Sequence, residues 1–162
     1  MANTEDGALR KQLVEFLRGN QAHADLKSVL DGFPEKLRGK KPQGSPHSAW
    51  QLLEHIRLAL RDLLDFSTNS SYVALKWPDG YWPAEDAPPS DDAWEASLRA
   101  VKKDMADFEK LIGEPKTNLY ATIPWGEGQT ILREVLLAGQ HTSYHLGQLV
   151  LLRRELGAWK DE

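Results

Sequence analysis

The chain has 162 residues, of which 41% are hydrophobic and 27% charged, a composition typical of one globular domain. Its formal net charge is −4 with acidic and basic residues interspersed, so no nucleic-acid-binding surface is expected. No apolar run approaches the ~20 residues that cross a bilayer. The absence of cysteine excludes disulfides, thiolate metal ligands and cysteine nucleophiles. The first residues lack the layout of a secretory signal, so we expect a cytoplasmic protein.

Apolar spacing predicts a first helical segment over residues 3–31. Its apolar positions are Leu9, Leu13, Phe16, Leu17, Leu26, Val29 and Leu30. Gly19 and Asn20 lie inside this segment and mark a point where it either continues or breaks in two, because glycine destabilises a helix interior by ~1 kcal/mol. Gly32 and Pro34 end the segment.

A second helix is predicted to begin with Ser45 as its cap and Pro46 in its first turn, where proline loses no needed N–H bond. Its apolar positions are Ala49, Leu52, Leu53, Ile56, Leu60, Leu63 and Leu64. Residues 69–89 follow as a long connection rich in proline and glycine. Its aromatic residues, Trp77, Tyr81 and Trp82, indicate that it packs against the domain.

A third helix is predicted from the capping candidates Ser90, Asp91 and Asp92 to Gly113. Its apolar stripe is Trp94, Leu98, Val101, Met105, Phe108 and Ile112. Residues 116–128 are irregular, with one short extended segment at 119–123, and a fourth helix runs from about Thr130 to Glu155. The sequence therefore predicts a single all-α domain over residues 1–162, an antiparallel four-helix bundle with long crossover connections.

Three histidines form the candidate functional site. His141 and His145 are four residues apart, so they lie on one helical face about one turn apart, together with Leu137, Ala138, Leu149 and Leu152. His55 lies beside the apolar stripe of the second helix, and in an antiparallel bundle the two faces can meet. Three imidazoles with one open position are the arrangement of a catalytic zinc-type site.

A simpler interpretation is a set of buried neutral imidazoles bonded to each other or to Tyr144 and Gln148. Burial favours a metal ion, because each unpaired imidazole nitrogen in a core costs ~1–3 kcal/mol. Two known sites are excluded by spacing. Thr142 stands where the HExxH metalloproteases carry their general-base glutamate, and no histidine follows a glutamate by three residues as in di-iron bundles.

At these residues the sequence resembles a known family. HTSYHLGQLVLLRRELG is similar to the last-helix signature of the DinB/YfiT-like family, His-x-x-x-His-x-Gly-Gln before an apolar run, and PHSAWQLLEHI is similar to its helix-two segment. The resemblance implies a four-helix bundle, often a homodimer, that holds a metal ion on His55, His141 and His145. The family usually has tryptophan eight residues before its helix-two histidine. Here that residue is His47, with Trp50 one turn later, so the usual tryptophan supports no inference about substrate.

The resemblance implies two classes of activity. Characterised relatives are thiol-dependent transferases or isomerases that use bacillithiol, mycothiol or related thiols, and others are metal-dependent hydrolases. We therefore expect a metal-dependent transferase or hydrolase with a small-molecule substrate, a divalent ion (zinc or nickel first) and a low-molecular-weight thiol. No carboxylate base stands out, which weakens the hydrolase version and favours either activation of a thiol or a histidine base. The alternatives are a stress-response bundle with a structural ion and a bundle without metal.

Second-tier candidates for lining the cavity or orienting a ligand are Gln148, Tyr144, His23, His47 and Trp50. Gln148 lies two turns after His141 on the same face, where it either orients a ligand or bonds to backbone. His23 and His47 are candidates for proton transfer if they approach the metal, and structural residues otherwise.

The side of the fourth helix opposite the histidines is also apolar. It carries Leu132, Leu136, Gly139, Ser143, Gly147 and Val150. Small residues repeat there every four positions, which lets another helix approach closely. Either the bundle covers this side or a second subunit does, and we favour the second subunit.

Overall fold

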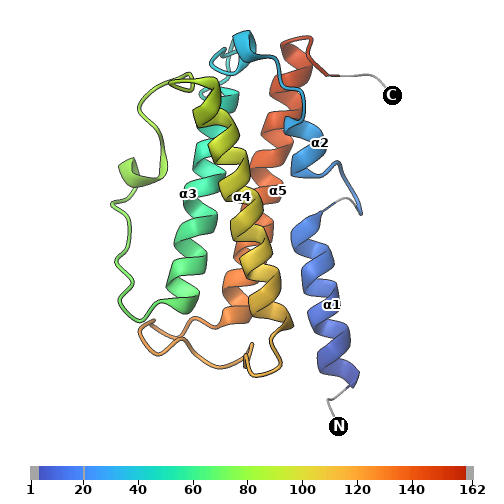
Figure 1. The fold of residues 1–162 in the computed structure, drawn as a ribbon, viewed down its shortest axis with the longest axis vertical. Helices are drawn as coiled ribbons and strands as arrows, with labels where there is room; N and C mark the ends of the chain where they lie inside the picture. The colour runs from blue at the N-terminus through green and yellow to red at the C-terminus, as the bar shows by residue number, and fades with distance from the viewer. Residues whose placement is uncertain (1–3, 20, 160–162) are drawn as a thin grey trace.

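Five α-helices and two short 3-10 turns make up the regular structure of the computed structural model, which describes residues 4–19 and 21–159. In chain order they are α1 (Thr4–Arg18), α2 (Leu26–Leu30), η1 (Glu35–Leu37), α3 (Ala49–Thr68), η2 (Asp79–Tyr81), α4 (Asp91–Gly113) and α5 (Ile131–Glu155). The four long helices pack as a bundle, which confirms the predicted all-α fold (Figure 1). The one β pairing in the described ranges is an isolated bridge between Thr122, which lies in the extended segment expected at 119–123, and Thr130, which lies outside it.

The first predicted segment is broken in two at Gly19. This residue has φ 71°, a conformation that glycine adopts without steric cost, and α1 ends directly before it. The chain becomes helical again after Asp25, whose carboxylate accepts a hydrogen bond from the Ser28 amide at 2.7 Å. The predicted start at Asn3 and the second residue of the break, Asn20, lie outside the described residues.

The second predicted helix begins later than expected, because its cap is Ser48 and not Ser45. The Gln51 amide donates to Ser48 Oγ, and the Ser48 amide donates to Gln51 Oε1, each at 3.2 Å. This capping box satisfies two amides at once, which the Ser45-Pro46 pair cannot do. Ser45 instead donates to the carbonyl of His47. His47 therefore lies in the connection before α3 rather than in its first turn.

Neighbouring helices are not all antiparallel. In Figure 1, α3 and α4 run in the same direction and α5 runs in the opposite one. The parallel pair arises because the connection between Asn69 and Ser90 passes back along the outside of the bundle from one end to the other (Figure 1). α3 contacts both α4 and α5, and it is antiparallel to α5. This arrangement brings the first half of α3 against the second half of α5.

The core lies where the four helices meet. α4 and α5 begin after Ser90 and Thr130, as predicted, and each cap side chain accepts from a backbone amide three residues on. Among the largest fully buried side chains are Phe33, Leu53, Ile56, Leu60, Trp94, Phe108 and Leu149. None of the helices in the described ranges is both long enough and apolar enough to span a membrane.

Candidate metal centre

The three histidines selected from the sequence converge on one point between two helices. α3 carries His55, and α5 carries His141 and His145. Each offers one ring nitrogen, and the three nitrogens all lie within 4.8 Å of one another. The Nε2 atoms of His55 and His141 are 3.0 Å apart, and the ring of His145 is 4.5 Å from each of the other two. The convergence is a property of the structure, and the role of these residues as ligands stays a prediction.

The outer nitrogens of two rings have fixed partners. His55 Nδ1 lies 2.8 Å from the backbone carbonyl of Tyr81, and His145 Nδ1 lies 2.7 Å from Oε1 of Gln148. A carbonyl oxygen only accepts, so both Nδ1 atoms donate and carry the hydrogen. The lone pairs of both Nε2 atoms are then left for the centre of the cluster. This is the arrangement that outer partners impose on metal-binding histidines.

His141 completes the cluster in a different way. Because the Nε2 of His55 carries a lone pair, the 3.0 Å contact requires a hydrogen on the Nε2 of His141. The centre therefore holds two lone pairs and one hydrogen. A metal ion would take the place of that hydrogen, which His141 can release by carrying its proton on Nδ1 instead.

All three imidazoles are held neutral at neutral pH. His55 and His145 are only 5% and 7% exposed. Burial lowers the pKa of each of the three histidines, and for His141 burial, with the neighbouring His145 and His55, lowers the pKa to about 4. The neutral ring is the form that binds a metal ion.

Trp82 forms one wall of the site. Its ring stacks on His55 at 3.8 Å and an interplanar angle of 4°, and on its other side His47 stacks at 3.9 Å and 14°. His47 is thus one aromatic ring away from the cluster, and burial followed by the charge of Lys41 lowers its pKa. The sequence indicated only that this loop packs down. Residues in a loop have no periodicity, so the sequence could not predict that Trp82 stacks on His55.

The remaining candidates differ in their relation to the cluster. Tyr144 makes an edge contact with His145, 4.9 Å between rings, but is 66% exposed. Trp50 belongs to the buried core. His23 lies exposed in the loop between α1 and α2, where its Nδ1 meets the carbonyl of Ala24. The structure does not bring Trp50 or His23 to the cluster. His23 lies in the loop that follows the break at Gly19, and it lines a cavity of its own with residues of α4 and α5.

A groove opens beside the cluster. It has a volume of about 290 Å³ and lies between the loop before α3 and the last turns of α5. Its lining includes His47, Gln148, Leu52, Leu151 and Glu155. Gln148 therefore bonds to the ring of His145 and also lines the open groove. A small molecule in this groove would lie one side chain away from the histidines.

Comparison with known families gives one match. The model of the DinB superfamily matches residues 18–149, a span that contains all three clustered histidines and Gln148. No curated protein and no solved structure matches the chain. Because the matched span covers most of the sequence and the observed bundle is the fold expected for this family, the chain belongs to the DinB superfamily.

Proposed function

We propose that this protein binds one divalent metal ion with His55, His141 and His145 as its ligands. The observation that carries the proposal is the convergence of three imidazoles within 4.8 Å, two of which already have their outer nitrogens bonded. A set of nitrogen donors without thiolates suits zinc or nickel. The rings are neutral and largely buried, so binding of an ion at neutral pH would need no net loss of protons from them, only the move of the His141 hydrogen from Nε2 to Nδ1.

We further propose that the ion is catalytic and that the reaction is a thiol-dependent transfer. The groove of about 290 Å³ provides space for a small molecule next to the cluster. An ion on three neutral ligands supplies Lewis acidity, which lowers the pKa of a bound water or thiol. No carboxylate belongs to the cluster formed by the described residues, so a hydrolase would have to take its acidic base from outside the cluster, as from Glu155 in the groove lining. This favours the transferase, with a low-molecular-weight thiol as cofactor, over the hydrolase.

Within this proposal the chain's own residues have separate tasks. His55 and His145 present their lone pairs because Tyr81 and Gln148 hold their outer nitrogens. Trp82 covers one face of His55 and keeps water from that side of the ring. His47, in contact with both Trp82 and the groove, is placed to touch a bound substrate.

The first experiment measures metal content. Protein purified without a metal-affinity tag or a chelator should contain about one ion per chain by elemental analysis, and the three alanine variants of the clustered histidines should contain none. His23→Ala is the matched control, since it removes an exposed histidine outside the cluster. Wild-type protein that takes up no Zn²⁺ or Ni²⁺ would refute the proposal, as would equal metal content in His141→Ala and wild type.

A second experiment separates a catalytic ion from a structural one, the alternative function of this site. Each kcal/mol of stability corresponds to roughly 2–4 °C in melting temperature for a chain of this size. A catalytic ion predicts that its removal lowers the melting temperature by only a few degrees but abolishes turnover of electrophiles in the presence of low-molecular-weight thiols. A fall of some tens of degrees with no thiol-dependent turnover would show that the ion only stabilises the bundle.

A further inference from the structure

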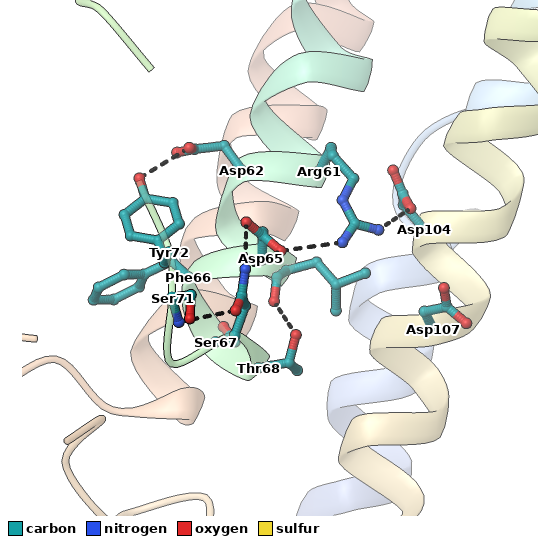
Figure 2. Close-up of polar contacts among 12 residues, drawn as sticks. Arg61, Asp62, Asp65, Phe66, Ser67, Thr68, Ser71, Tyr72, Asp104 and Asp107 are labelled. Carbon is teal, nitrogen blue, oxygen red and sulfur yellow. Dashed lines mark hydrogen bonds and ion pairs between the residues drawn. The ribbon is translucent and has the colours of Figure 1, made fainter. Parts of the chain in front are cut away.

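The first residues of the connection after α3 are hydrogen-bonded to the last turn of that helix. Asn69 donates from Nδ2 to both carboxylate oxygens of Asp65, at 3.2 and 3.3 Å, and its own Oδ1 accepts from the amide of Ser71. Arg61 contacts Asp65 and also reaches Asp104 on α4 (Figure 2). The contacts of Asn69 hold the chain where it reverses, and the connection then runs back along α3 towards its first turn (Figure 1).

One carboxylate holds this connection at two points. The phenol of Tyr72 donates to Oδ1 of Asp62 at 2.9 Å, and the phenol of Tyr81 donates to Oδ2 at 2.8 Å. Figure 2 shows the contact between Tyr72 and Asp62 beside the last turns of α3. Burial and the carboxylate raise the pKa of Tyr81 to about 12 and that of Tyr72 further, so both phenols stay protonated donors.

Tyr81, the second residue that Asp62 holds, also contacts the candidate metal centre. Tyr81 carries the backbone carbonyl that accepts from His55 Nδ1, and the next residue, Trp82, covers the face of the same ring. Two consecutive residues thus fix both the edge and the face of one imidazole. Asp62 lies seven residues after His55, so it shares the same side of α3 two turns on.

We propose that Asp62 is a positioning residue for the metal centre. By holding the phenol of Tyr81, it places the carbonyl of that residue against His55, and so sets the tautomer and orientation of the ring. Its effect on metal affinity rests on the proposed function, whereas its effect on the ring exists in the metal-free protein too. A carboxylate that only anchors the loop would act equally through both of its phenols.

Two variants distinguish a positioning role of Asp62 from simple anchoring of the loop. Each variant removes one of the two phenol hydroxyls that donate to Asp62. Tyr81→Phe loosens the residue that carries the carbonyl, and Tyr72→Phe is its matched control. Outer partners of metal-binding histidines typically change affinity by about 10–100-fold. We expect Tyr81→Phe and Asp62→Ala to weaken Zn²⁺ binding by roughly 10-fold, measured by competition with a chelator, and Tyr72→Phe to stay within about two-fold of wild type.

The second readout is the nitrogen-15 NMR spectrum of the metal-free protein. Wild type and Tyr72→Phe should show His55 with its hydrogen on Nδ1, whereas Tyr81→Phe should show a mixture of tautomers at His55 and an unchanged His145. Equal loss of Zn²⁺ affinity in the two phenylalanine variants, or an unchanged His55 signal in Tyr81→Phe, overturns the positioning role. Should the wild type fail to bind Zn²⁺, the proposed function fails, and the His55 spectrum still decides this inference.

Discussion

His55 and His141 are separated by 86 residues in the chain, yet their Nε2 atoms lie 3.0 Å apart. The contact exists because α3 and α5 are antiparallel neighbours, which brings the first half of α3, with His55, against the middle of α5, with His141 (Figure 1). It also defines the centre of the cluster, since His145 lies one turn from His141 on the same face of α5.

The first prediction concerns the hydrogen in this contact. In the metal-free protein His141 should carry its hydrogen on Nε2, whereas His55 and His145 carry theirs on Nδ1. Addition of one equivalent of Zn²⁺ should move the hydrogen of His141 to Nδ1 and leave the other two tautomers unchanged. Long-range nitrogen-15 NMR spectra distinguish the forms. A His141 that already carries its hydrogen on Nδ1 without metal would contradict the assignment.

The second prediction concerns Gln148. Replacing it with leucine keeps the approximate volume but removes the acceptor for His145 Nδ1, so the ring loses its fixed tautomer. We expect metal affinity to fall by about 10-fold or more. Gln140→Leu serves as the control, because Gln140 is an exposed glutamine on the same helix. Equal affinities for the two variants would show that Gln148 does not orient the ring.

The third prediction is a pH dependence of stability in the metal-free protein. The pKa of His141 is lowered from 6.5 to about 4 in the folded state, so between these values the unfolded chain binds more protons than the folded one. The free energy of unfolding should therefore fall as the pH drops from about 6.5 to about 4, by an amount of the order of 2 kcal/mol from this residue. His55 and His145, whose pKa values are also lowered, should add to the fall.

Urea unfolding at several pH values from 7 to 4.5 checks this dependence. The His141→Gln variant should show a shallower fall than wild type, since glutamine does not titrate. A slope that is the same in both proteins would mean that His141 does not remain neutral in the folded state.

The fourth prediction contrasts two glycines on α5. A Cβ on Gly139 would overlap the ring of Phe16 from α1, whereas a Cβ on Gly147 would meet no atom within 4 Å. Gly147→Ala should stabilise the protein by up to ~1 kcal/mol through helix propensity alone. Gly139→Ala should destabilise it by about 1 kcal/mol, because the Phe16 ring has to move. Thermal unfolding of both variants tests this, and two changes of the same sign would contradict it.

The fifth prediction concerns assembly. Phe16 covers Gly139, so α1 packs against part of the side of α5 that we expected a second subunit to cover. Beyond that contact, Leu136, Tyr144 and Leu151 remain 46%, 66% and 58% exposed along α5 on the side that carries Gly147. We propose that this stripe is the subunit contact of a homodimer. Light scattering should then give a dimer mass for wild type and a monomer mass for Gly147→Leu. A monomeric wild type at every concentration would rule out the homodimer.

The sequence by itself determined most of the helices and half of the site. The regular spacing of apolar residues predicted α4 and α5 closely, and glycine at position 19 marked a real helix end because the backbone there has a positive φ. The pairing of His141 with His145 also followed from sequence alone, since four residues are one helical turn.

Only the tertiary structure decided the rest. Whether His55 would reach the other two depended on the direction and neighbours of α3, which no local pattern specifies. The choice of Ser48 over Ser45 as the cap depended on a reciprocal bond with Gln51. The hydrogen-bond acceptor for His55 is the backbone carbonyl of Tyr81. Because every residue has a backbone carbonyl, the residue type at position 81 does not predict this contact. Hydrogen bonds made by the backbone of a loop can be assigned only when the long-range packing that positions the loop is known.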